Sequence, residues 1–293
     1  MEGMHKMSEL SVDEILRGFA VFDGIYKRAE VDAAIACREE VAPRLIEVLD
    51  AVLSNPERAS EDESNFGHVY ALMLLGHFRE PRAHRVVVQL ASLPGDLPYR
   101  LFGDTVTEDL AVVLLRTCDG SFDAIKGLVQ NRDADDYCRG AAAKAISYGV
   151  VEGSITREEA LSFLGGMLEE GAADVSGAFY DIVASCIHDL YPEELMDRIE
   201  SAYANGLIHS FHVDIGSFRS ALARGKEKCL VELRTELEDR SLNDVHKSMS
   251  WWACFQERPQ RLAVEKPAGQ RASKEERKKA KRKIARASRK RNR

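Results

Sequence analysis

The chain has 293 residues, 45% of them apolar, enough to bury a sizeable core in one elongated domain or two small ones. The N-terminal segment MEGMHKMSEL lacks the apolar stretch of a signal peptide, and no run approaches the roughly 18 apolar residues of a membrane span, so we expect a cytoplasmic protein without membrane contact. The net charge of −7 is unevenly distributed: residues 257–293 carry 16 of the 41 Lys and Arg residues and 4 of the 48 Asp and Glu residues, a net charge of +12, so residues 1–256 carry −19.

The cysteines are widely spaced, never form a C-x-x-C pair and fall mostly on apolar helix faces. They are Cys37, Cys118, Cys138, Cys186, Cys229 and Cys254. This pattern favours small buried hydrophobic residues in a reducing compartment over a disulfide framework or a zinc site.

The first predicted helix begins after Ser11, which forms an S-x-x-E capping box with Glu14, and Gly24 ends it. Two further helices are predicted, one on the apolar face of residues 31–35 and one that starts at Pro43 and carries the apolar face of residues 45–53. The polar run 55–64 is expected to be a loop.

Residues 66–93 predict a hairpin of two helices. In each half apolar residues recur at helical spacing, and the turn Arg79-Glu80-Pro81 separates the halves because Pro81 suits the first turn of a helix. The first half is apolar almost all round, so we expect other helices to cover it on two sides.

Further helix pairs follow in the same style. Thr107 is predicted to cap a helix that ends near Cys118, with Glu108 and Asp109 in its first turn, and Asp119-Gly120 breaks the chain. Later segments are a face of small residues over 138–149, its partner over 160–168, a long apolar stripe over 175–190, and a further helix over 195–203.

Corresponding positions in these pairs recur at intervals of about 32 to 39 residues. The positions are Val31, Tyr70, Glu108, Gly140 and Gly177. Such a period built from helix pairs predicts an all-α fold of the HEAT-like α-solenoid type, a stack of helical hairpins; an irregular all-α domain is the alternative. Beyond Gly206 the pattern weakens, and helices over 230–237 and 245–253 are expected to cap the open end of the stack.

Four segments together resemble an uncharacterised bacterial family catalogued as domain of unknown function eleven-eighty-six, over roughly residues 11–255. They are FREPRA (78–83), GDTVTEDL (103–110), YPEEL (191–195) and MSWWACF (249–255). The resemblance implies a HEAT-like helical fold and no assigned activity. Members of that family often end in a cysteine-rich zinc motif, but no cysteine follows Phe255 here, so a zinc function is not expected.

No catalytic residue, cofactor or metal site is predicted. The pair His209 and His212 lacks a third ligand, and the acidic run 131–135 lacks the glycine and glutamate of a calcium loop. No nucleophile elbow, phosphate loop or H-E-x-x-H motif occurs. We therefore expect a protein that is not an enzyme, with an unrecognised enzyme whose site lies on the concave face as an alternative.

Two surface features are candidates for binding a partner. Asp104, Glu108 and Asp109 either cap a helix or form a binding patch at the repeat edge. The only tryptophans are adjacent: we expect Trp252 in the core, while Trp251 either helps to close the core or offers a partly exposed aromatic contact to a partner.

The C-terminal residues 257–293 form a separate basic tail after the domain 1–256. A capping box at Ser273 and a run of Ala, Lys and Arg favour helix, but with Ile284 as the one large apolar residue of that run the tail is expected to be disordered or only partly helical. Its candidate nucleic-acid-binding residues are Lys278, Lys279, Lys281, Arg282, Lys283, Arg286, Arg289, Lys290 and Arg291. Aiding solubility, or folding onto the acidic body, are the alternatives to RNA or DNA binding.

The sequence therefore predicts a helical scaffold that binds another macromolecule, first of all a protein. The basic tail would add electrostatic contacts, including contacts to nucleic acid.

Overall fold

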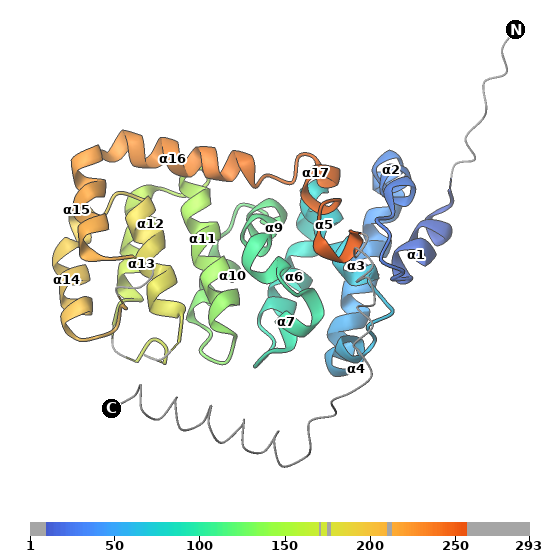
Figure 1. Cartoon of the computed structure of the whole chain (residues 1–293), viewed down its shortest axis with the longest axis horizontal. Helices are drawn as coiled ribbons and strands as arrows, with labels where there is room; N and C mark the ends of the chain where they lie inside the picture. Colours follow the sequence, from blue (N-terminus) through green and yellow to red (C-terminus); the bar gives the residue numbers. More distant parts are fainter. Residues whose placement is uncertain (1–9, 170, 175–176, 210–212, 257–293) are drawn as a thin grey trace, which may run out of the picture. The chain divides into compact units, whose positions relative to one another are not determined.

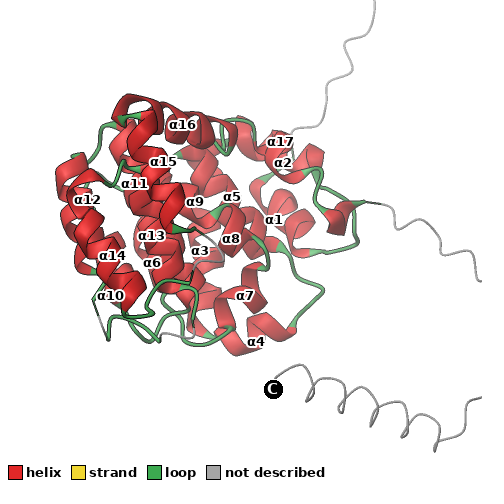
Figure 2. Ribbon diagram, turned by 60° about the vertical axis from the view of Figure 1, so that its left-hand side comes forward, coloured by secondary structure: helices red, strands yellow, loops and turns green. Residues whose placement is uncertain are grey.

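The computed structural model describes residues 10–169, 171–174, 177–209 and 213–256, and in this part of the chain every regular element is a helix (Figures 1 and 2). The α-helices are α1 (Val12–Ala20), α2 (Arg28–Ala36), α3 (Arg38–Ser54), α4 (Pro56–Glu61), α5 (Gly67–Phe78), α6 (His84–Ala91), α7 (Leu97–Phe102), α8 (Thr105–Glu108), α9 (Leu110–Thr117), α10 (Asp123–Gln130), α11 (Asp136–Glu152), α12 (Arg157–Gly166), α13 (Phe179–Asp189), α14 (Met196–Ala204), α15 (Ile215–Arg224), α16 (Lys226–Asp239) and α17 (Val245–Met249). Three 3-10 helices, η1 (Pro81–Ala83), η2 (Glu193–Leu195) and η3 (Ala253–Phe255), complete the set. The predicted all-α class is confirmed.

Five of these helices pack side by side in chain order. Helix α5 lies between α3 and α9, α9 packs against α11, and α11 packs against α13. Helices α6, α10 and α12 pack against members of this row, α6 against α3 and α9, α10 against α11, and α12 against α11 and α13. Every residue of α5 except His77 is buried, so the prediction that neighbours cover it on two sides is confirmed.

Small residues allow these helices to approach closely. A side chain at Gly140 of α11 would meet Ile182 of α13 at 2.7 Å, and one at Gly149 would meet the ring of Phe122 at 2.5 Å. The predicted small-residue face of 138–149 thus packs directly against its neighbours.

The turn after α5 matches the sequence expectation. Arg79 adopts the left-handed conformation (φ 51°), and the amide of Glu80 donates to the carbonyl of Leu75, which closes a Schellman-type end before Pro81. A left-handed residue also follows α13, where Tyr191 has φ 68° and Pro192 precedes η2.

Three buried arginines satisfy carbonyl groups near helix ends. Arg116 Nε donates to Gly76 O of α5 (2.9 Å), Arg139 Nε to Val129 O of α10 (3.0 Å), and Arg157 Nε to Leu190 O after α13 (2.6 Å). The last carbonyls of a helix lack intrahelical partners and carry partial negative charge. A guanidinium group there donates the missing hydrogen bonds and its positive charge offsets the partial negative charge.

Several of the side-chain hydrogen bonds join residues 33 positions apart. The pairs are His68 with Leu101, His84 with Thr117, Lys126 with Glu159, Arg139 with Ala172, and Arg157 with Leu190. The contacts between neighbouring helix pairs therefore recur at a constant interval along much of the row.

The C-terminal helices do not take the place predicted for them. Helix α16 packs against α11, α13 and α15, and α17 packs against α5, so the chain runs back along the row instead of capping its far end (Figure 1). Gly76 makes this possible: a side chain there would lie 2.7 Å from Leu242, which fills that space. The expected cap is corrected to a strap, which we define as residues 226–249.

Two local expectations also differ. The polar run 55–64 contains α4, whose first turn is capped by Asn55 and begins with Pro56. Helix α1 ends at Ala20 rather than at Gly24, which lies in the following loop with φ 77°. The capping box of Ser11 and Glu14 is confirmed.

Val183→Asp should prevent stable folding. Val183 is fully buried in α13, and an unpaired buried carboxylate costs several kcal/mol, against about 5–15 kcal/mol for the stability of a whole domain. Thermal melting followed by circular dichroism measures this effect. Ser162→Asp, at an exposed position of α12, is the control and should melt close to wild type. A cooperative melt of the Val183→Asp variant near the wild-type temperature would contradict this packing.

Candidate functional site

An open groove of about 450 Å³ lies where the ends of α5, α9 and α11 meet. Its lining comes from the turn after α5, the last turn of α9 with the loop to α10, and the end of α11. These residues are Arg79, Pro81, Leu115, Arg116, Cys118, Asp119, Gly120, Phe122, Glu152 and Ser154. Three turns from separate parts of the chain thus form one surface.

An ion pair joins two of these turns. Arg79 Nη1 lies 3.0 Å from Glu152 Oε1, and the Arg79 side chain remains 53% exposed. Arg79 holds the left-handed backbone conformation that glycine adopts without strain, at a cost on the order of 1–3 kcal/mol. The chain therefore keeps a cationic side chain at the groove in spite of a local backbone cost.

Burial shapes the ionisation of the groove residues. It lowers the pKa of Arg116 to about 10, with the nearby Arg79 charge acting in the same direction, so the Arg116 guanidinium is still charged at neutral pH. Burial also raises the pKa of the Cys118 thiol, which keeps it protonated and unsuited to nucleophilic attack.

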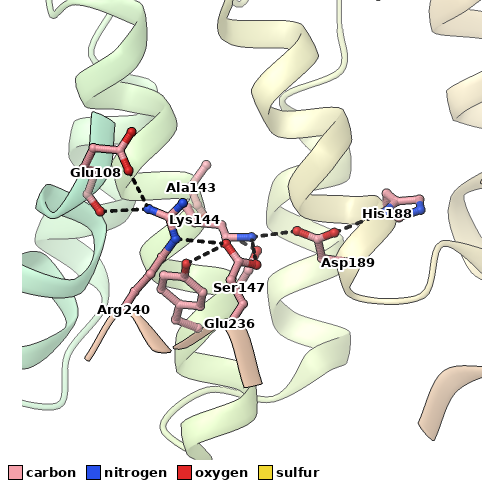
Figure 3. Close-up of polar contacts among 9 residues, drawn as sticks. Glu108, Ala143, Lys144, Ser147, His188, Asp189, Glu236 and Arg240 are labelled. Carbon is pink, nitrogen blue, oxygen red and sulfur yellow. Dashed lines mark hydrogen bonds and ion pairs between the residues drawn. The ribbon is translucent and has the colours of Figure 1, made fainter. Parts of the chain in front are cut away.

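A second polar cluster ties the strap to the row (Figure 3). Lys144 Nζ of α11 lies 2.7 Å from Asp189 Oδ2 and 2.8 Å from Glu236 Oε2 of α16, and the Tyr148 hydroxyl donates to Glu236 Oε1 (2.9 Å). Burial alone would lower the pKa of Lys144, but the carboxylate charges, Asp189 first, raise it above its usual value. Lys144 is thus a protonated, paired group that joins helices and not a free amine nucleophile.

The same cluster includes Glu108, one of the predicted binding residues. Arg240 Nη1 of the strap donates to both the carbonyl and the carboxylate of Glu108, each at 3.1 Å (Figure 3). Asp104 accepts a hydrogen bond from the Tyr99 hydroxyl (3.1 Å). Both residues therefore contact other parts of the fold.

Asp109 is partly buried. Burial raises the pKa of its carboxyl to about 7, the Glu108 charge adds to this rise, and Arg240 opposes it. Its side chain does not cap α9, and the predicted cap at Thr107 is wrong, because Thr107 lies in α8 and its hydroxyl donates to Asp104 O. Asp104 and Glu108 lie one helical turn apart at exposed positions, whereas Asp109 is only partly exposed. A partner-binding role for the three residues stays a prediction.

The structure agrees with the predicted exposure of Trp251 but only in part with the predicted core position of Trp252, which packs against the core while only partly buried. Trp251 is 67% exposed, while the Trp252 ring stacks on Phe255 with centroids 6.0 Å apart. The predicted helix is shorter than expected, since α17 ends at Met249. Lys278, Arg282 and the other candidate tail residues lie outside the described residues, as do Val175 and His212.

The sequence reasoning missed the groove. The turn at Arg79 is visible as a helix stop, but its partner Glu152 follows 73 residues later and no local pattern links them. Within the described residues, no cluster of three His, Cys, Asp or Glu side chains is arranged to hold a metal, and His209 contacts Asp181 instead (amide to Oδ1, 2.7 Å). In the same part of the chain, no helix is both long and apolar enough to cross a membrane.

Fold and groove define an all-helical protein with an open surface site. The chain belongs to the bacterial family described as "Protein of unknown function (DUF1186)", whose model matches residues 10–256. It is similar to an uncharacterized protein of Chlamydia trachomatis, 27% identical over 244 residues that cover 83% of this chain and 96% of the relative. An uncharacterized protein of Chlamydia muridarum is likewise 27% identical over 241 residues, 81% of this chain and 96% of the relative. No solved structure matches the chain significantly.

Asp109→Asn should stabilise the protein at pH 8 and much less at pH 5. The folded protein holds a proton on Asp109 that the unfolded chain releases above about pH 4, so wild-type stability falls as the pH rises from about 4 to 7. Asparagine does not ionise, so the melting temperature of the variant relative to wild type should rise by several degrees between pH 5 and pH 8. Asp104→Asn, at an exposed position, is the matched control. A difference for Asp109→Asn that does not change with pH would contradict the buried carboxyl.

Proposed function

We propose that this protein is a non-enzymatic helical-repeat scaffold that binds another macromolecule, first of all a protein. The observation that carries the proposal is the open groove at the ends of α5, α9 and α11. Its volume of about 450 Å³ falls within the roughly 300–1,000 Å³ of typical ligand sites, enough for several side chains of a bound segment.

Three features support a HEAT-like solenoid as the scaffold. Helices α3, α5, α9, α11 and α13 form a row in chain order, with α6, α10 and α12 packed against it. Contacts between pairs recur 33 residues apart, and the turn of a left-handed residue followed by proline or a 3-10 helix occurs after both α5 and α13. Stacked repeats characteristically offer successive turns as one extended binding surface.

The groove chemistry favours a peptide or protein segment over a small polar metabolite. Leu115 and Phe122 offer apolar contacts, while Arg79 and Glu152 offer one charge of each sign. A partner with an apolar side chain beside a polar one would contact both the apolar residues and the ion pair. Protein interfaces commonly combine an apolar centre with a polar rim in this way.

We further propose that the protein acts in the cytoplasm. Cys118, Cys138, Cys186, Cys229 and Cys254 are free thiols. Burial raises the pKa of Cys138 and Cys186, to about 12 for each, as expected for cysteines that serve as packing residues in a reducing compartment.

A substitution that blocks the groove tests the binding proposal. Ser154→Trp places a large side chain at an exposed position in the groove and should abolish partner capture. Ser162→Trp, at an exposed position of α12 outside the groove, should leave partner capture unchanged. Both variants and wild type serve as bait for nuclease-treated extract of the source bacterium, with captured proteins identified by mass spectrometry. The proposal predicts proteins retained by wild type and Ser162→Trp but lost with Ser154→Trp. Equal retention by Ser154→Trp would exclude the groove as the binding site.

A second candidate function is nucleic-acid binding through residues 257–293, which carry a net charge of +12. Phosphates are the natural targets of such a polycation, and engaging about six of them should weaken binding roughly a thousandfold between 50 and 200 mM salt. Truncation after Gln256 should abolish binding to both single strands and duplexes, measured by fluorescence anisotropy with labelled oligonucleotides. Retained binding by the truncated protein, or no binding by the whole protein at about 50 mM salt, would exclude this role.

A further inference from the structure

Three helix ends meet at the groove, and two of them have an arginine side chain beside them. The helices are α5, α9 and α11, and each reaches the groove with its C-terminal end, which carries partial negative charge. At the end of α5, Arg116 Nε and Nη2 donate to the carbonyls of Gly76 and His77. At the end of α11, the Arg79 guanidinium lies 3.0 Å from the Glu152 carboxylate.

The end of α9 adds a negative charge instead of a positive one. Helix α9 ends at Thr117, and Asp119, two residues later, lines the groove at an exposed position. Asp119 Oδ1 accepts a hydrogen bond from the amide of Ser121 (3.1 Å), and within the described residues the Asp119 carboxylate forms no ion pair. The end of α9 and the Asp119 carboxylate together favour a cation at this place.

The fold itself does not supply that cation. The two arginines of the groove already have partners: Arg79 pairs with Glu152, and the remaining nitrogen of Arg116, Nη1, donates to Asn243 of the strap (2.8 Å). The space beside Asp119 is open, because a side chain at Gly120 would meet no atom within 4 Å. A side chain from a partner can therefore approach the carboxylate from the groove.

We propose that the groove binds an arginine side chain of the partner protein, with its guanidinium group paired with Asp119 at the end of α9. This proposal rests on the proposed binding of a protein segment in the groove and names the side chain that such a segment presents. The fold uses the same chemistry elsewhere, since Arg116 and Arg157 donate to carbonyls at the ends of α5 and α13. A planar guanidinium group donates in several fixed directions, so it can bond a carboxylate and a carbonyl together, whereas an ammonium group is a point charge.

Peptides from a phage-displayed library of random sequences of about 12 residues serve as the probe, selected on the full-length protein. Peptides that wild type retains and Ser154→Trp loses are groove ligands. These peptides should be enriched in arginine. Citrulline has nearly the same shape as arginine and no charge, so exchanging the arginine for citrulline should weaken binding about tenfold or more, measured by fluorescence anisotropy.

Asp119→Asn should weaken binding of the same arginine peptides by a similar factor. Asparagine keeps the oxygen that accepts from Ser121 and removes the charge, so the turn is preserved. In Asp119→Asn the exchange of arginine for citrulline should have no further effect, because the two groups act as one pair. Asp133→Asn, at an exposed position outside the groove, is the matched control and should bind like wild type.

The outcomes separate this proposal from the proposed function. Groove ligands without arginine, or arginine peptides that bind Asp119→Asn as tightly as wild type, would overturn the arginine site and leave the groove as a binding site. If Ser154→Trp retains every peptide that wild type retains, the groove is not a peptide site and both proposals fall.

Discussion

The buried guanidinium groups near helix ends are the contacts on which the row of helices depends. Arg116, Arg139 and Arg157 each take up carbonyl groups near the end of another helix, and the Arg139 guanidinium also lies 3.7 Å from the centre of the Phe179 ring. A buried charge without partners is costly, so each arginine favours the helix arrangement that keeps these carbonyl groups within hydrogen-bond distance. Through these bonds Arg116 joins the end of α5 to the last turn of α9, beside the groove.

The strap adds a second constraint, because its contacts join residues that lie far apart in the sequence. Arg240 reaches Glu108, Glu236 reaches Lys144, and the carbonyl of Leu242 bonds the His77 ring at 2.6 Å. These polar ties hold the segment that carries Trp251 against α5 and the loop after α1. The strap therefore also contacts His77 and Arg116, next to the groove.

Local patterns predicted much of the helix content, and long-range contacts explain what they missed. The periodicity of 66–93, the capping box at Ser11 and the proline turn at Pro81 depend on neighbours within one or two helical turns. The place of the strap depends on the gap beside Gly76 that Leu242 fills, 166 residues later in the chain. For the same reason the tryptophan exposure was predictable from its own segment, whereas the groove needed Arg79 and Glu152 to meet across 73 residues.

Hydrogen exchange followed by mass spectrometry on Arg139→Met tests most directly whether the protein is a row of locally coupled helix pairs. In such a row each pair contacts only its neighbours, so removing one buried guanidinium should weaken protection near the lost contacts. Amide exchange in the variant should be faster than in wild type in peptides from α10, α11 and α13 and unchanged in peptides from α3 and α5. Equal loss of protection across all helices would contradict it and indicate a single cooperative core.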